Sequence, residues 1–259
     1  RGNAVAFLAP LIYQKSNPPR CKDRFVRDEE KPAIRSLPLF HEVSTPTFEA
    51  LMATSYSQNF PPQLDLFRQG DRADFLHILI EGSVELHADW NGREAVMAMV
   101  RPVSSFILAA CIRDVPYLMS ARTLERSRIL LLPAVDLRAA IRREPELAGA
   151  VMTELAGSYR DMVRQAKNMK LRTARERLAA WLLDQAHRQG AANSFVLPVE
   201  KRHLASYLGM TPESLSRALA GLKAQGIAMD GARVIITDRE RLSATAGYDP
   251  LIDSSDEGL

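Results

Sequence analysis

The hydrophobic pattern changes its period once, near Val135, and this change divides the chain into two architectures. Before it, from Phe60 to Pro133, short apolar or alternating runs are separated by the turn pairs Gly70-Asp71, Glu81-Gly82 and Asn91-Gly92. Asn-Gly is a strong hairpin signal, and many short strands at this spacing predict a compact antiparallel roll or sandwich. After Val135, apolar residues recur at helical spacing. An α+β protein is therefore expected.

The stretch that follows Pro145 predicts one long helix with a single apolar stripe. The stripe is an imperfect heptad seam at four-three spacing, formed by Leu147, Val151, Leu155, Ser158, Met162, Gln165 and Met169. Such a helix lies on the roll or pairs with a second copy of itself. Because the stripe continues for more than three heptads and charged residues flank it, we expect a parallel dimer seam.

Two short helical patterns meet at a glycine in the stretch "HLASYLGMTPESLSRALAGL". Ala205, before the glycine, is small enough to let the second helix cross closely. Thr211 is suited to cap the second helix, and Pro212 fits its first turn. A hairpin with Asp230-Gly231 at its tip follows. This order predicts a winged helix-turn-helix.

The second helix carries polar residues near its N-terminus, the end that enters the major groove in such motifs. The Arg217 guanidinium can donate to guanine O6 and N7, the Glu213 carboxylate can accept from cytosine, and Ser216 is a short donor or acceptor. Glu213 and Arg217 also have the spacing of a surface ion pair, but the cap, turn and hairpin favour base reading. Supporting contacts to DNA, chiefly to phosphate, are expected from Thr211, Ser214, Lys201, Arg202 and Lys223.

The composition limits the class of protein. The 259 residues are 46% hydrophobic and 25% charged, and the net charge of +3 with a pI near 9.0 agrees with a polyanionic partner. Two cysteines, Cys21 and Cys111, make neither a disulfide scaffold nor an iron–sulfur ligand set. No apolar stretch approaches membrane-spanning length, and no signal peptide is evident, so we expect a cytoplasmic protein without membrane contact. Phosphate-loop, metal and nucleophile-elbow motifs are absent from the sequence, so no enzyme is expected.

These patterns together predict five segments. They are a flexible N-terminal segment at 1–32, a sensor roll at 33–140, a dimerisation helix at 141–170, a winged helix-turn-helix at 171–246 and a flexible tail at 247–259.

This order of roll, long helix and winged helix-turn-helix resembles the Crp/Fnr family of transcription regulators. The stretches "FLHILIEGSVEL", "KLRTARERLAAWLL" and "LPVEKRHLASYLGMTPESLSRAL" carry the resemblance, which covers residues 35 to 245. It implies a cyclic-nucleotide-binding-like β-roll, a homodimer with two heads on palindromic double-stranded DNA, and contact with RNA polymerase. Activation and repression both stay open.

The resemblance also implies which half-site is read. The fumarate–nitrate branch uses the pattern E-x-x-S-R, which falls here on Glu213, Ser216 and Arg217. The catabolite branch has an arginine where this chain has Pro212. TTGAT-like half-sites are therefore expected.

Cyclic-nucleotide binders of the family hold the phosphate with a Gly-Glu pair and an Arg-Ser/Thr pair. Ile107-Leu108 and the segment Tyr117-Leu118-Met119 stand in those places, so we expect neither cAMP nor cGMP. Cys21 alone does not supply the cysteine cluster of the iron–sulfur branch. A cyclic-nucleotide-binding module of the kind attached to kinases or channels is the alternative from another class. The missing phosphate ligands and the helix-turn-helix argue against it.

The stretch "SFILAA" resembles the nitric-oxide and denitrification regulators of the family, which implies an apolar pocket for haem and a response to nitric oxide or low oxygen. His77, in the strand "FLHILI", is the candidate axial ligand, and its alternative is a half-buried strand histidine. Cys111 is a candidate redox thiol or a small buried hydrophobe. His41 and His87 are expected at the surface. A ligand-independent or thiol-controlled regulator is the alternative.

Overall fold

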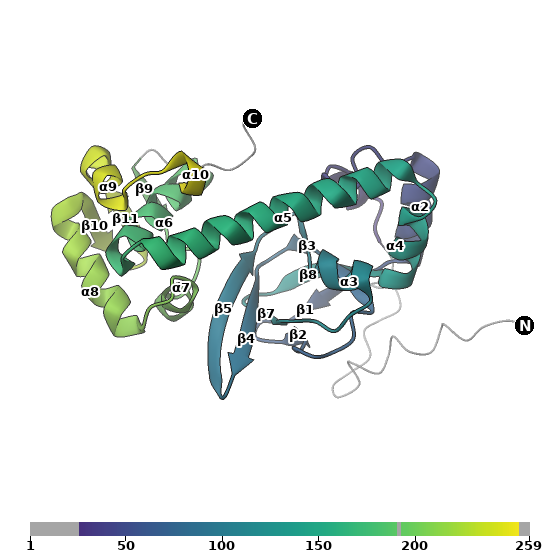
Figure 1. The fold of residues 1–259 in the computed structure, drawn as a ribbon, viewed down its shortest axis with the longest axis horizontal. Helices are drawn as coiled ribbons and strands as arrows, with labels where there is room; N and C mark the ends of the chain where they lie inside the picture. Colours follow the sequence, from purple (N-terminus) through teal and green to yellow (C-terminus); the bar gives the residue numbers. More distant parts are fainter. Residues whose placement is uncertain (1–25, 191–192, 254–259) are drawn as a thin grey trace, which may run out of the picture.

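Helix α5 (Pro145–Leu171) runs along most of the molecule and joins a β-roll near its first half to a small helical head at its other end (Figure 1). The structure is a computed structural model, and it describes residues 26–190 and 193–253. None of the helices in those ranges is long and apolar enough to cross a membrane.

The roll consists of two four-stranded antiparallel sheets, in the orders β1-β8-β3-β6 and β2-β7-β4-β5. Its strands are β1 (Tyr56–Phe60), β2 (Asp65–Phe67), β3 (Phe75–Glu81), β4 (Val84–Trp90), β5 (Arg93–Val100), β6 (Ser104–Phe106), β7 (Ser120–Thr123) and β8 (Ser127–Pro133). The Asn91-Gly92 turn is confirmed: both residues have positive φ, and they join the paired ends of β4 and β5.

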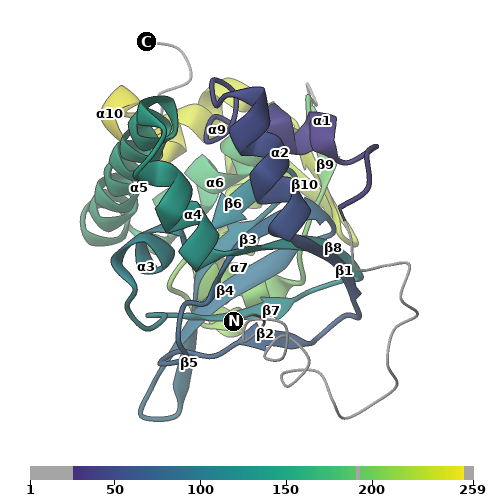
Figure 2. The ribbon, with the colours of Figure 1, turned by 90° about the vertical axis from the view of Figure 1, so that its right-hand side faces the viewer.

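Four helices accompany the roll: α1 (Lys31–Arg35), α2 (Thr45–Thr54), α3 (Leu108–Arg113) and α4 (Ala134–Ile141). Figure 2 shows α2 and α4 on one side of the sheets, and both pack against β8. The structure corrects the predicted N-terminal boundary. Glu30 is buried and forms an ion pair with Arg128 on β8, so residues from Val26 onward belong to the roll. Residues 1–25 of the expected flexible segment lie outside the described residues.

The first turns of α5 correct part of the predicted dimer seam. Leu147 and Val151 are 0% and 5% exposed, and both belong to the hydrophobic core of the roll. Their side chains are therefore unavailable to a second chain. Burial against the roll takes the first two positions of the predicted seam. The remaining positions are Leu155, which is half-buried against the roll core, the half-buried Gln165, and the exposed Ser158, Met162 and Met169.

The head contains a second hydrophobic core and a three-stranded sheet in the order β10-β11-β9. Its elements are α6 (Ala174–Arg188), β9 (Ser194–Val196), α7 (Lys201–Tyr207), α8 (Pro212–Leu222), the 3-10 turn Lys223–Gln225, β10 (Ile227–Asp230), β11 (Arg233–Ile236), α9 (Arg239–Ala246) and α10 (Pro250–Asp253). The predicted flexible tail is corrected at 247–253, because the Asp253 carboxylate accepts from both terminal nitrogens of Arg172 at 2.7 and 2.5 Å. Residues 254–259 lie outside the described residues.

Candidate nucleic-acid interface

The turn between α7 and α8 has the local geometry of a capped helix start. The Thr211 hydroxyl accepts from the Ser214 backbone N–H at 3.2 Å, and Pro212 is the first residue of α8. Gly209 has a φ of +65°, and a Cβ placed on it would lie 2.3 Å from the Met169 side chain. A glycine therefore suits this turn both by its backbone conformation and by its closeness to α5.

The predicted base-reading side chains share the solvent-facing side of α8. Glu213, Ser216 and Arg217 are all exposed, whereas Leu215, Ala218, Leu219 and Leu222 are buried in the head. The Arg217 guanidinium donates to the Ser214 hydroxyl at 3.1 Å, and the Ser216 hydroxyl donates to the Pro212 carbonyl at 2.9 Å. The backbone N–H of Glu213 and the Thr211 hydroxyl lower the pKa of the Glu213 carboxyl. An ionised acceptor therefore stands beside a guanidinium donor.

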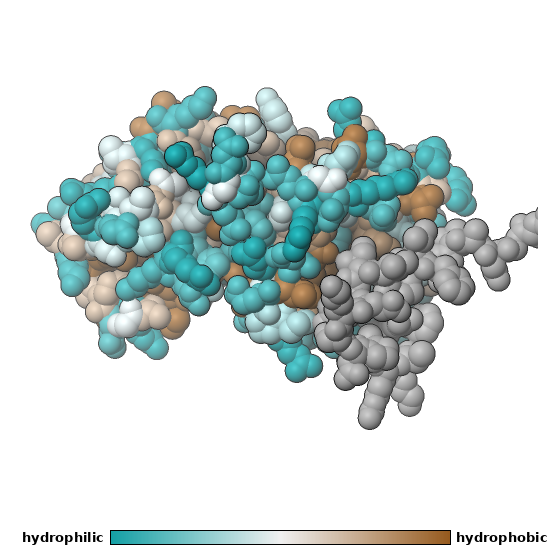
Figure 3. Space-filling view, turned by 90° about the horizontal axis from the view of Figure 1, so that it is seen from below, coloured by the Kyte–Doolittle hydropathy of each residue, from teal (hydrophilic) through white to brown (hydrophobic). Residues whose placement is uncertain are grey.

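The predicted phosphate contacts surround this face. Lys201 and Arg202 are exposed at the start of α7, and Lys223 is exposed at the end of α8. Arg202 also forms an ion pair with Glu200 at 2.9 Å. Figure 3 views the molecule from the side toward which α8 and the β4–β5 hairpin project, and that surface is largely hydrophilic. A polar surface of this kind suits a charged polymer more than an apolar partner.

Arg177 on α6 supports the helix-turn-helix, and sequence reasoning did not find it. Its guanidinium is buried, and it donates to the Leu208 carbonyl at 3.0 Å and to the Arg172 carbonyl at 2.6 Å. The first bond holds the end of α7 and the second holds the end of α5. An arginine on an amphipathic helix normally predicts a solvent-facing residue, so no local pattern indicates this role.

The interior of the roll is filled by aromatic side chains. The rings of Tyr117 and Phe67 stack with centroids 4.0 Å apart, and Phe106 stacks on Phe67 at 6.4 Å. The Tyr117 hydroxyl donates to the Phe75 carbonyl at 2.9 Å. Burial raises the pKa of Tyr117, so the phenol is neutral. By the resemblance, the segment Tyr117-Leu118-Met119 stands in the place of the Arg-Ser/Thr pair of the family's nucleotide binders. Leu118, within this segment, is 81% exposed.

His77 lies within this aromatic cluster. Its ring centroid is 4.8 Å from that of Phe67, 5.3 Å from Phe106 and 6.2 Å from Tyr117. Its Nδ1 has no hydrogen-bond partner, and burial lowers the pKa of His77 to about 3. An axial haem ligand needs open space beside its ring. Because aromatic rings contact the imidazole instead, the residues present do not fit a haem at His77.

The Cys111 thiol is fully buried and donates to the Phe75 carbonyl at 3.1 Å. Burial raises the pKa of Cys111 to about 12. Redox sensing requires an accessible thiolate, so this environment disfavours the redox role. Cys21 lies outside the described residues, and the described ranges contain no group of three or more His, Cys, Asp or Glu residues suited to a metal.

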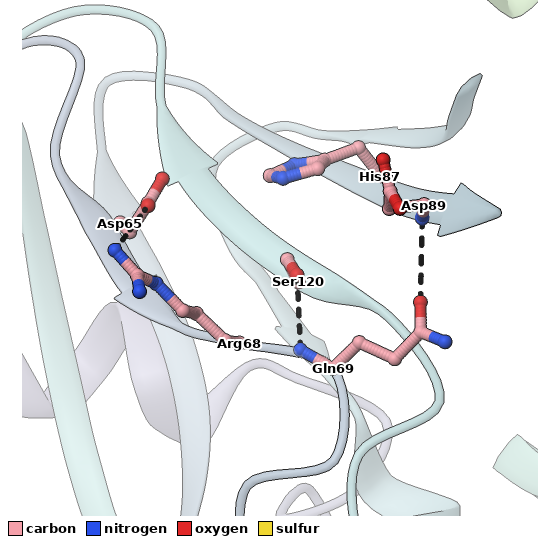
Figure 4. Close-up of a pocket in the computed structure, with 6 residues that line it drawn as sticks. All are labelled: Asp65, Arg68, Gln69, His87, Asp89 and Ser120. Carbon is pink, nitrogen blue, oxygen red and sulfur yellow. Dashed lines mark hydrogen bonds and ion pairs between the residues drawn. The ribbon is translucent and has the colours of Figure 1, made fainter. Parts of the chain in front are cut away.

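His87 corrects a further expectation, because it is buried although a surface position was predicted. It lies on the outer face of the sheet β2-β7-β4-β5, with Nε2 3.4 Å from a terminal nitrogen of Arg122 and 3.7 Å from the Glu94 carboxylate. It also lines an open hollow of about 370 Å³ with Asp65, Arg68, Gln69, Asp89 and Ser120 (Figure 4). The two aspartates make this hollow a poor site for a phosphate.

A roll of this topology, followed by a long helix and a winged helix-turn-helix, defines a class of DNA-binding transcription regulators. Residues 57–144 match the cyclic nucleotide-binding domain, and residues 176–245 match the Crp-like helix-turn-helix domain. The chain belongs to the Crp/Fnr family of regulators, and the predicted fold class is confirmed.

Relatives from several bacteria agree with this assignment. The transcriptional activator protein FnrL of Cereibacter sphaeroides is 30% identical over 79% of this chain and 84% of its own. The CRP-like cAMP-activated global transcriptional regulator of Mycobacterium tuberculosis is 27% identical over 80% of this chain and 96% of its own. The structure of FixK2 from Bradyrhizobium japonicum shares the fold, with a TM-score of 0.67, 22% identity, and coverage of 75% of this chain and 98% of that one.

Proposed function

We propose that the protein is a homodimeric regulator that reads a TTGAT-like palindrome through Glu213, Ser216 and Arg217. The observation that carries this proposal is the exposed face of α8, where an ionised carboxylate, a hydroxyl and a guanidinium follow a capped helix start. These groups match the donors and acceptors of base edges in the major groove. Thr211, Ser214, Lys201, Arg202 and Lys223 would position the head on the backbone. The protein would act in the cytoplasm, with RNA polymerase as a further partner.

The exposed part of α5 supports the homodimer. Met152, Tyr159 and Met162 are 66%, 68% and 68% exposed, and Met169 is 40% exposed. With Leu155 and Ala166 they form a stripe at strict three-four spacing, which we call the α5 stripe: Met152, Leu155, Tyr159, Met162, Ala166 and Met169. A large apolar stripe with this period is what a parallel two-stranded coiled coil buries. Compared with the predicted seam, this stripe contains Met152, Tyr159 and Ala166 and omits Leu147, Val151, Ser158 and Gln165.

The filled roll supports regulation without a cyclic nucleotide. Tyr117, Phe67 and Phe106 occupy its interior, and the segment Tyr117-Leu118-Met119 contains no arginine that could bind a phosphate. His77 in its aromatic surroundings does not support a haem-based response to nitric oxide, and the buried Cys111 does not support a thiol response. We therefore favour a roll that acts as a ligand-independent scaffold for the dimer and the heads.

Gel shifts on a TTGAT-N4-ATCAA duplex test the proposal. The Arg217→Ala variant is expected to weaken binding by about 1–3 kcal/mol. It should also relax the preference for the G·C base pair within each half-site. Lys201→Ala is the matched control, because loss of a phosphate contact weakens binding evenly across sequences. If Arg217→Ala leaves affinity and base preference unchanged, α8 does not read the bases through this residue.

A further inference from the structure

The Ser214 hydroxyl links the capped start of α8 to the arginine proposed to read a base. The Thr211 hydroxyl donates to it at 3.2 Å, and a terminal nitrogen of Arg217 donates to it at 3.1 Å. The three residues follow one another at three-residue intervals, so their side chains lie on one face of the helix. They form a hydrogen-bonded chain that begins at the N-cap and ends at the guanidinium.

The start of this chain is fixed by the helix backbone. The Ser214 backbone N–H donates to the Thr211 hydroxyl at 3.2 Å, and this is the capping bond of α8. The Thr211 side chain is therefore oriented by the helix start. A serine side chain has three staggered rotamers, and the bonds to Thr211 and Arg217 favour one of them for Ser214. Its half-buried position restricts the side chain further.

Arg217 bonds to Ser214 although a charged neighbour is within reach in the sequence. Glu213 stands four residues before Arg217, and this spacing permits an ion pair. Among the described residues of the head, Arg217 forms no ion pair, and its guanidinium donates to the Ser214 hydroxyl instead. The Glu213 carboxylate is therefore not paired with Arg217 and can accept from a base.

The bond to Ser214 orients Arg217 in the direction that base reading requires. Because Ser214 lies one turn earlier, the guanidinium is held toward the N-terminal end of α8, which is the end that enters the major groove in a helix-turn-helix. A guanidinium has five N–H donors. Ser214 accepts from one of them, and a guanine needs two. The bond therefore leaves enough donors for the base.

An exposed arginine benefits from such a support. Its side chain samples many rotamers in solution, and its restriction to one rotamer on binding opposes association. A side chain that is oriented before binding loses less of this freedom. Ser216 does not provide the support, because its hydroxyl donates to the Pro212 carbonyl at 2.9 Å. Ser214 is therefore the hydroxyl of α8 that acts on Arg217.

We propose that Ser214 is a positioning residue that sets the base specificity of Arg217, in addition to its contact with the DNA backbone. The inference rests on the proposed DNA-reading function. A phosphate contact acts on every DNA sequence alike, whereas a group that orients Arg217 acts only where a guanine is present. Loss of the Ser214 hydroxyl should therefore reduce sequence discrimination more than it reduces affinity for DNA in general.

Ser214→Ala in the full-length chain tests this role, because it keeps the backbone N–H that donates to Thr211. Fluorescence anisotropy gives dissociation constants for the TTGAT-N4-ATCAA duplex and for TTAAT-N4-ATTAA, in which the G·C pair of each half-site is replaced. The constant for the second duplex divided by that for the first is the discrimination ratio. We expect this ratio to fall by about threefold to tenfold, the effect of one net intramolecular hydrogen bond. Ser214→Thr keeps a hydroxyl and should restore the ratio.

Three further variants separate this role from others. Lys201→Ala removes a proposed phosphate contact and should weaken binding to both duplexes equally. Ser243→Ala is the matched control, because Ser243 is a half-buried serine on α9, outside the helix-turn-helix. It should change neither constant. In the Arg217→Ala background, Ser214→Ala should cause no further change in the discrimination ratio, because the side chain that it orients is absent.

A measurement without DNA tests the orientation itself. The order parameter of the Arg217 Nε–H bond, from nuclear magnetic relaxation of the free protein, reports the mobility of this side chain. We expect a lower order parameter in Ser214→Ala than in the wild type, and the wild-type value in Ser243→Ala.

The outcomes separate this inference from the proposed function. An unchanged discrimination ratio, equal weakening on both duplexes, or an unchanged order parameter would show that Ser214 does not position Arg217. The same loss of discrimination in the Arg217→Ala background would show that Ser214 acts independently of it. In each of these cases base reading by α8 stands. If the wild type does not prefer TTGAT-N4-ATCAA over TTAAT-N4-ATTAA, the DNA-reading proposal fails and the positioning role fails with it.

Discussion

The ring of Tyr117 stacks on the ring of Phe67 at a centroid distance of 4.0 Å, and its hydroxyl reaches the Phe75 carbonyl. One side chain therefore both fills the roll interior and satisfies a backbone group of β3. Tyr117 belongs to the segment that, by the resemblance, stands in the place of the Arg-Ser/Thr pair of the family's nucleotide binders. The roll fold is retained, while the interior is occupied by the protein's own rings.

Replacement of Tyr117 should separate packing from hydrogen bonding. Tyr117→Ala removes a buried aromatic ring and leaves a cavity, so we expect the free energy of unfolding to fall by about 3–5 kcal/mol. Tyr117→Phe keeps the ring and loses one hydrogen bond, at a cost of about 1 kcal/mol. Urea unfolding followed by circular dichroism measures both. Equal losses for the two variants would contradict the packing role of the ring.

His77 should make stability depend on pH. Its pKa is about 3 in the folded chain and about 6.5 when unfolded. Between these values the unfolded state binds a proton that the folded state does not, so stability falls as pH falls below 6.5. From pH 7 to pH 5 the loss due to His77 should be about 2 kcal/mol.

The His77→Phe variant isolates this effect, because it keeps a ring and removes the titrating group. The difference in unfolding free energy between wild type and variant should change by about 2 kcal/mol from pH 7 to pH 5. A difference that stays constant with pH would show that His77 does protonate in the folded protein. His41→Phe is the control, since His41 is exposed.

Arg177 should be needed for the stability of the head. Arg177→Met leaves the Leu208 and Arg172 carbonyls without their charged donor, and we expect a loss of about 3 kcal/mol from two charge-assisted hydrogen bonds. Trp181 packs against the head core, so its fluorescence during urea unfolding reports the change. Arg202→Met, at an exposed position, should leave the urea midpoint of this unfolding transition unchanged. An unfolding transition of Arg177→Met at the wild-type urea concentration would show that Arg177 does not stabilise the head.

Met162 should decide the oligomeric state. A glutamate at the centre of the α5 stripe places like charges opposite each other in a two-stranded seam, so Met162→Glu should shift the protein to a monomer. Sedimentation velocity at a fixed protein concentration measures the mass. Thr153→Glu is the control, because Thr153 is exposed on the same helix but outside the stripe. A dimer that survives Met162→Glu would place the interface on another surface.

Local signals predicted the elements of this fold. Asn91-Gly92 predicted the β4–β5 hairpin, and Thr211 with Pro212 predicted the start of α8; both were correct, because positive φ and helix capping depend on neighbouring residues. The heptad period likewise predicted α5. It did not distinguish the roll-facing Leu147 and Val151 from the exposed stripe, because one period fits both a core face and a seam.

By itself the sequence determined the order of roll, long helix and winged head, and the chemistry of the exposed face of α8. Only the tertiary structure decided that Arg177 faces inward, that His87 is buried, and that Glu85 meets His203, which lies 118 residues further along the chain. The physical reason is that burial and pairing of charged groups depend on which surfaces come together after each element has formed. Strand and helix periodicity assign a side chain to a face, but they do not show what covers that face.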